Sequence, residues 1–156
     1  MKSTFTIVLA SDHAGFVLKN SVKEWLVGEG FTVLDCGAEG YDALDDFPDF
    51  ISKAAQMVSA KPAKSRGIIF GGSGQGEAMV ANRFPHVRAT VFYGGPEEII
   101  TLSREHNDAN VLSIGARFID EDTAKRVIWK WLHEPTSLDE KHHRRNQKID
   151  SVTKKK

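Results

Sequence analysis

The regular alternation of short apolar runs with segments of helical period most constrains how this chain can fold. Five apolar runs have the length and composition of buried strands, at 5–10, 31–34, 67–70, 89–93 and 111–114. Apolar residues recur at helical spacing between and after them, which predicts helices over 18–29, 47–58, 77–82, from Pro96 onward, 124–132 and 139–152. Strands separated by helices form parallel sheets covered on both faces. The sequence therefore predicts an α/β fold with a five-stranded parallel sheet.

Composition narrows the class of protein further. The 156 residues are 40% hydrophobic, which suits one domain over 1–156, with a C-terminal helix at 139–152 and a basic tail at 153–156. The formal net charge is zero, which argues against a nucleic-acid partner. No apolar run approaches the roughly 20 residues that span a membrane. The start of the chain lacks a signal-peptide pattern, and the single cysteine, Cys36, permits no intramolecular disulfide, so we expect a cytoplasmic protein.

Polar and glycine-rich residues follow the predicted strands. Ser11, Asp12 and His13 come directly after the first strand, a glycine-rich loop at 71–76 follows the third, and residues 115–117 follow the fifth. In parallel sheets, ligands bind beyond the carboxyl ends of the strands. We therefore expect the functional site at this edge.

The loop at 71–76 has four glycines in six positions. Its backbone N–H groups could approach an anion closely, and the helix that follows adds partial positive charge. The loop lacks the Gly-Lys-Ser/Thr ending of a nucleotide-binding P-loop, and its spacing is not G-x-G-x-x-G. A purely structural turn and an anion site both stay open for the loop alone, while Ser73 and Glu77 favour function. Glu77 itself could be a helix-dipole residue or a general base.

Two histidines stand beside acids, in Asp12-His13 and in the segment 105–108, and we expect both near the carboxyl edge of the sheet. The four others, at 86, 133, 142 and 143, lack this setting and are interpreted as structural or solvated. No pair of histidines has the spacing of a zinc-binding helix, so we expect no metal.

Three motifs in order carry a resemblance: ASDHAGF at 10–16, GGSGQGE at 71–77 and SREHNDANVLSIGAR at 103–117, followed by a basic C-terminal helix. From about Thr4 to Val152 the chain resembles the type B ribose-5-phosphate isomerase family, which includes galactose-6-phosphate isomerase subunits. The resemblance implies a Rossmann-like three-layer α/β/α sandwich. It also implies a homodimer or dimer of dimers with shared active sites, and no metal or organic cofactor. The implied reaction isomerises ribose 5-phosphate to ribulose 5-phosphate by ring opening and a cis-enediolate.

The same resemblance implies roles for individual residues. Asp12 and His106 correspond to the ring-opening pair, and Ser73 to the hydroxyl that moves a proton between O1 and O2. Asn107 corresponds to the oxyanion hole, together with the amides of Gly72, Gly74, Gln75 and Gly76. The phosphate ligands correspond to His13, Arg117, Arg144 and Lys148. The neighbouring subunit would supply His106, Asn107 and Arg117.

Three departures from the family pattern bear on these roles. One branch has a cysteine base where this chain has Gly71, whereas another branch uses the glutamate that corresponds to Glu77, which we expect to be the base here. Phe47 replaces a usual tyrosine, and Lys148 replaces a second phosphate arginine. These changes leave open another substrate, such as galactose 6-phosphate, allose 6-phosphate or a four-carbon sugar phosphate. A non-catalytic sugar-phosphate sensor also stays open.

Overall fold

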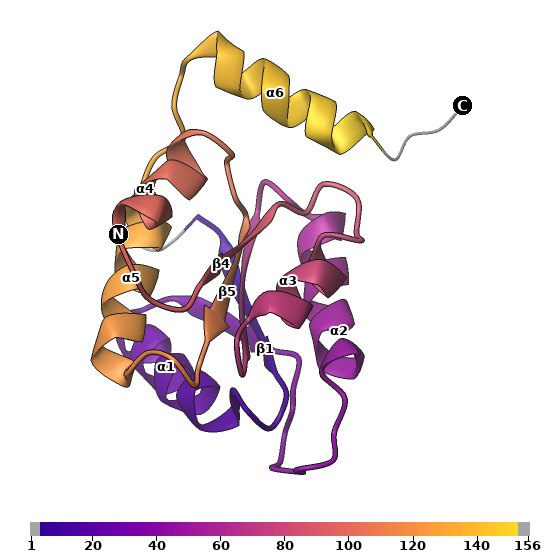
Figure 1. Ribbon diagram of the computed structural model, residues 1–156, viewed down its shortest axis with the longest axis vertical. Helices are drawn as coiled ribbons and strands as arrows, with labels where there is room; N and C mark the ends of the chain where they lie inside the picture. The colour runs from indigo at the N-terminus through magenta and orange to yellow at the C-terminus, as the bar shows by residue number, and fades with distance from the viewer. Residues whose placement is uncertain (1–3, 153–156) are drawn as a thin grey trace.

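The computed structural model describes residues 4–152, so the predicted basic tail at 153–156 lies outside the described residues. Strands and helices alternate along the chain (Figure 1). In chain order they are β1 (Thr6–Ser11), α1 (Phe16–Gly28), β2 (Thr32–Asp35), α2 (Phe47–Ala60), β3 (Ser65–Gly71), α3 (Gln75–Ala81), β4 (Ala89–Phe92), α4 (Glu98–Glu105), β5 (Val111–Gly115), α5 (Glu121–His133) and α6 (Glu140–Ser151). Each predicted strand and helix is present, with ends shifted by a few residues.

The five strands form one parallel sheet in the order β2-β1-β3-β5-β4. The predicted five-stranded parallel sheet is therefore confirmed. β3 lies at its centre and pairs with β1 through Leu9 and Ile68, and with β5 through Gly71 and Gly115. The carboxyl ends of β1, β3 and β5 consequently meet side by side, which brings the loops after these strands together.

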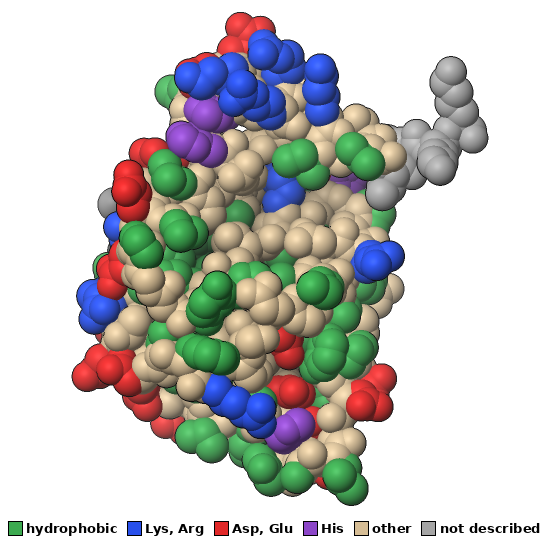
Figure 2. All heavy atoms as spheres, in the orientation of Figure 1, with side chains coloured by type: hydrophobic (Ala, Val, Ile, Leu, Met, Phe, Trp, Pro, Cys, Tyr) green, Lys and Arg blue, Asp and Glu red, His purple; other side chains and the backbone are tan. Residues whose placement is uncertain are grey.

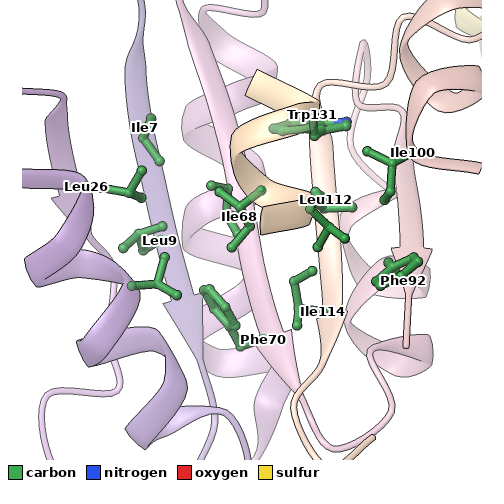
Figure 3. Close-up of a cluster of buried hydrophobic side chains, with 13 residues drawn as sticks. Ile7, Leu9, Leu26, Ile68, Phe70, Phe92, Ile100, Leu112, Ile114 and Trp131 are labelled. Atoms are coloured by element: carbon green, nitrogen blue, oxygen red, sulfur yellow. The ribbon is translucent and has the colours of Figure 1, made fainter. Parts of the chain in front are cut away.

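Alternate side chains of each strand enter two different apolar clusters, because successive residues of a strand point to opposite faces. Ile7 and Leu9 of β1 join the cluster that α1, α4 and α5 cover (Figure 3). Val8 and Ala10 join the cluster on the other face, which α2 and α3 cover. The two clusters make the molecule a three-layer α/β/α sandwich (Figure 1).

Helix α6 lies apart from these layers, beyond the amino edge of the sheet (Figure 1). Polar contacts attach it: the Arg88 guanidinium donates to both carboxylate oxygens of Asp150, at 2.9 and 2.8 Å, and the Asn146 amide donates to the His106 carbonyl at 3.1 Å. Among residues 4–152, no helix has the length and apolar character needed to cross a membrane.

A buried ion pair joins α1 to the end of β2. The Lys19 side chain is 0% exposed, and its ammonium group donates to both oxygens of Asp35, at 2.7 and 2.9 Å, and to the Ala38 carbonyl at 2.9 Å. Burial alone raises the pKa of Asp35, but hydrogen bonds led by those from Lys19 and the Gly37 N–H outweigh it and hold the pKa below its ordinary value. The pair anchors the loop that follows β2.

We expect Lys19→Met to lower the free energy of unfolding by about 3 kcal/mol, because it leaves a half-buried carboxylate without its main partner. The matched control is Lys23→Met, since Lys23 contacts the same carboxylate at 3.0 Å from an exposed position. Its cost should stay below about 1 kcal/mol. Urea unfolding of both variants measures the difference, and equal losses would contradict the assignment.

Candidate active site

The glycine-rich loop after β3 is held against the segment after β5 by backbone hydrogen bonds. The Ala116 N–H donates to the Gly71 carbonyl at 2.8 Å, and the Arg117 N–H donates to the Gly72 carbonyl at 3.1 Å. The Ser113 hydroxyl donates to the Gly74 carbonyl at 2.6 Å. These contacts turn loop carbonyls toward β5, so the loop has a defined conformation before any ligand binds.

The loop after β3 requires glycine because the segment after β5 approaches it closely. Gly74 has φ +79°, a conformation that side chains disfavour, and a Cβ there would lie 3.1 Å from the backbone of Ile114. A Cβ on Gly115 would lie 2.7 Å from the Ser73 carbonyl oxygen. The loops after β3 and β5 can therefore pack together only because both lack side chains at these positions.

The Glu77 carboxylate occupies the space beside Gly71. Glu77 lies in the first turn of α3 and is 4% exposed. A Cβ built on Gly71 would overlap the carboxylate of Glu77. Position 71 is where one branch of the resembled family has its cysteine, so in this chain the glutamate carboxylate takes the place that a side chain at 71 would need.

Burial raises the pKa of Glu77, and the negative charge of Asp12 raises it further, while a hydrogen bond from the backbone N–H of Glu77 lowers it. The net pKa lies above the ordinary glutamate value, because burial and the charge of Asp12 outweigh the hydrogen bond. A carboxylate with a raised pKa both accepts and returns a proton more readily at neutral pH than an ordinary glutamate does.

Asp12 and His13, at the end of β1, lie at the same edge of the sheet. The carboxylate of Asp12 is buried and accepts the N–H groups of Ala14 at 3.0 Å and Gly15 at 3.3 Å. His13 Nδ1 lies 3.9 Å from Asp12 Oδ2 and 2.6 Å from an oxygen of Asp45. One imidazole nitrogen of His13 and one carboxylate oxygen each of Asp12 and Asp45 all lie within 4.8 Å of one another. The first strand thus adds an acid and an imidazole to the edge that carries Glu77.

Three further predicted residues lie at this edge. Arg117 packs beside Gly72, since a Cβ on Gly72 would lie 3.2 Å from a guanidinium nitrogen. The chain therefore places Arg117 at its own loop, in contrast to the expected origin in a neighbouring subunit. The Ser73 hydroxyl accepts the Gln75 N–H at 3.3 Å and stays partly exposed. Phe47 packs against Gly76, where a Cβ would lie 2.7 Å from its ring.

The prediction that His106 lies near the carboxyl edge was wrong. Helix α4 begins after β4 and returns to the opposite edge, so His106 and Asn107 lie just before β5 begins. The Asn107 carbonyl accepts the Arg88 side-chain Nε–H at 2.9 Å, and Arg88 directly precedes β4. Within one chain, the two edges are separated by the length of the sheet.

Asp108, an acid that follows His106 by two positions, has a structural role. It accepts hydrogen bonds from Arg104 at 2.8 Å and from Arg88 at 3.0 Å. Burial raises its pKa, but the charge and hydrogen bonds of Arg104 outweigh this and hold the pKa below its ordinary value. The segment that carries His106 and Asn107 is therefore anchored by ion pairs.

Basic side chains gather over α6, next to histidines (Figure 2). His142 stacks on His106, with ring centroids 4.2 Å apart and an interplanar angle of 7°, and Asn146 is buried. These two residues define the inner face of α6. Arg144 and Lys148 each follow one of them by two positions, roughly 200° around the helix. Arg144 and Lys148, which we expect to bind the phosphate, therefore lie on a side of α6 that points away from His106.

Sequence reasoning missed two residues of these two edges, Arg145 and Asp45. His142, which was interpreted as structural or solvated, stacks on His106, a contact compatible with a structural role. Arg145, three positions after His142, borders the inner face of α6, and the spacing from His142 could have found it. Asp45 contacts His13 from a loop 32 residues away, and no local pattern signals such a pair.

We expect the Glu77 carboxyl to titrate above the ordinary glutamate range, and Asp12→Asn to lower its midpoint by removing a negative charge. Carbon-13 NMR of the carboxyl, assigned by loss of the signal in Glu77→Gln, measures both. The folded state holds the Glu77 proton more tightly than the unfolded state does. The contribution of Glu77 to the free energy of unfolding should therefore fall as the pH rises through the raised pKa. Glu77→Gln should remove this pH dependence of the stability. An ordinary midpoint unaffected by Asp12→Asn would contradict the assignment.

Known proteins resemble this chain over most of its length. Residues 7–149 match the family described as Ribose/Galactose Isomerase. Ribose-5-phosphate isomerase B of Mycolicibacterium paratuberculosis is 40% identical over 139 residues, which cover 89% of this chain and 86% of that protein. Probable ribose-5-phosphate isomerase B of Mycoplasma genitalium is 35% identical over 146 residues, which cover 94% of both.

Solved structures share the fold. The crystal structure of ribose-5-phosphate isomerase B from Mycoplasma genitalium, with bound ribulose-5-phosphate, aligns with a TM-score of 0.92 at 34% identity and covers 100% of both chains. The enzyme from Clostridium thermocellum aligns with a TM-score of 0.88 at 35% identity, over 96% of this chain and 98% of that one. The resemblance inferred from the three motifs is confirmed, and this chain belongs to the ribose/galactose isomerase family.

Proposed function

We propose that this chain is an aldose–ketose isomerase that interconverts ribose 5-phosphate and ribulose 5-phosphate. One observation carries the proposal: a buried carboxylate, Glu77, with a raised pKa, beside the glycine-rich loop at the end of β3. Proton abstraction next to a carbonyl needs these two elements, a base and donors for the developing oxyanion. The relative that binds ribulose-5-phosphate supports this choice of substrate.

In the proposed reaction, Glu77 removes the proton from C2 of the open-chain aldose. The electron pair of that bond forms the C1–C2 double bond, and the C1 carbonyl oxygen becomes the oxyanion of a cis-enediolate. The amides of Gly72, Gly74, Gln75 and Gly76 donate to the oxyanion. Ser73 transfers the hydroxyl proton from O2 to O1, and Glu77 returns its proton to C1, which leaves the ketose.

The remaining roles divide between the two edges of the sheet. At the carboxyl edge, Asp12 assists ring opening, and His13 and Arg117 bind the phosphate. At the amino edge, His106 is the other ring-opening group and Asn107 adds to the oxyanion hole. Cations of α6 complete the phosphate site, and Arg145 borders the inner face better than the expected Arg144 and Lys148 do.

The distance between the residues of the carboxyl edge and those of the amino edge supports a shared site in a homodimer. Strand β5 has five residues, so its ends are roughly 15 Å apart. One substrate cannot contact Glu77 and His106 of the same chain, whereas a two-fold axis can bring one edge of each subunit to the other. A cavity of about 400 Å³ beside Asn107 and Ile149 leaves this edge open. A dimer of dimers, the absence of a cofactor and a cytoplasmic location also stay predictions.

The proposal predicts turnover of ribose 5-phosphate ahead of galactose 6-phosphate, allose 6-phosphate and a four-carbon sugar phosphate in a panel of substrates. Glu77→Gln should lower kcat by about 100-fold or more, because the amide cannot accept the proton. Exchange of solvent deuterium into C2 of the aldose should fall in parallel. Cys36→Ser is the control and should leave turnover unchanged. No turnover of any sugar phosphate would favour a sensor.

Gly71→Ala tests the same carboxylate without altering it. The added methyl group overlaps the Glu77 carboxylate and must displace it, so kcat should fall by about tenfold or more, since misplacement by an ångström has effects of this order or larger. Gly28→Ala is the matched control, because its Cβ would meet nothing within 4 Å. Wild-type kcat in Gly71→Ala would contradict the proposed base.

A shared site predicts complementation between inactive subunits. Glu77→Gln damages one edge and His106→Ala the other, so a mixed dimer should contain one intact site. Mixing the two variants after subunit exchange should restore part of the activity. Exchange is confirmed separately by mass spectrometry of labelled subunits. Confirmed exchange without recovery would count against the shared site.

A further inference from the structure

Asp45 makes two contacts with the residue that we propose binds the phosphate. It lies between β2 and α2, and its Oδ1 lies 2.6 Å from His13 Nδ1. The same oxygen accepts the backbone N–H of His13 at 3.1 Å. One carboxylate oxygen therefore holds both the main chain and the ring of His13.

The surroundings make this contact the main interaction of both side chains. The Asp45 carboxylate is 7% exposed, and its second oxygen is buried without a partner among residues 4–152. Within the same part of the chain, no lysine or arginine pairs with Asp45. The Tyr41 ring stands edge-on to the His13 ring, with centroids 6.2 Å apart, and limits its rotation.

An acceptor at Nδ1 determines what the other ring nitrogen can do. When Nδ1 donates its proton to a carboxylate, the ring orientation is set and Nε2 is the nitrogen left for a ligand. In the described residues, His13 Nε2 has no hydrogen-bond partner. The His13 side chain is 23% exposed, which leaves part of the ring accessible to a bound molecule.

We propose that Asp45 is a positioning residue: it holds the Nδ1 proton of His13 and directs Nε2 toward the phosphate of the substrate. The inference rests on the proposed function, because it assigns His13 to the phosphate. Asp45 touches no substrate atom and acts through His13 alone. Its removal should therefore weaken phosphate binding and leave the proton transfer at Glu77 intact.

Asp45→Asn removes the charge and keeps the shape, and Asp45→Ala removes the acceptor. Asp46→Asn is the matched control, since Asp46 is the exposed neighbour and its side chain makes no capping hydrogen bond to α2. Nitrogen-15 NMR, assigned with His13→Ala, reports the ring protons. We expect the Nδ1 signal of His13 to change in both Asp45 variants and to stay unchanged in Asp46→Asn.

Two binding measurements complete the test. The dissociation constant of inorganic phosphate, measured by titration, and KM for ribose 5-phosphate should both rise about tenfold in Asp45→Asn, the scale of one charge-assisted hydrogen bond. The kcat should change little. A changed Nδ1 signal with unchanged phosphate binding would overturn the proposal, as would equal effects in Asp46→Asn or an unchanged Nδ1 signal.

The NMR and phosphate titration do not depend on turnover. If the wild type isomerised no sugar phosphate, the proposed function would fail, while these two measurements would still decide whether Asp45 positions His13. If Asp45→Ala does not fold, Asp45→Asn alone gives the same decision.

Discussion

The close approach of the chain segments after β3 and β5 is the constraint on which the site depends. Two backbone hydrogen bonds join residues 71–72 to residues 116–117, and a Cβ on Gly115 would lie 2.7 Å from the Ser73 carbonyl oxygen. Side chains at these positions would push the segments apart. The contact places the loop amides, Arg117 and the start of α3 at one edge, and the roles proposed for these groups require it.

A second constraint follows inside this loop. The Glu77 carboxylate and a side chain at position 71 compete for the same space, so a base reaches this point either from 71 or from 77. Gly71 leaves the space to Glu77. The carboxylate is consequently buried near Asp12, and the resulting rise of its pKa is a cost to stability at high pH that suits proton transfer.

Local periodicity predicted the strands, the helices and the carboxyl-edge group because each depends on neighbours in sequence. The strand order could not be predicted in this way. The position of His106 could have been predicted, because a helix after a parallel strand must return across the sheet, so a residue at its end lies at the opposite edge. Asp45 lies 32 residues from His13, and only the folded loop brings them together.

Several contacts also hold His106 and its neighbours in place at the amino edge. His142 of α6 stacks on His106, Asn146 binds its carbonyl, and Arg88 ties both α6 and Asn107 to the start of β4. This amino edge is built as firmly as the carboxyl edge, although no proposed base lies there. If the groups at both edges act on one substrate, as we propose, a second copy of the chain must face the first. The length of the sheet, rather than any residue at a contact, is therefore the main argument for the proposed assembly with shared active sites.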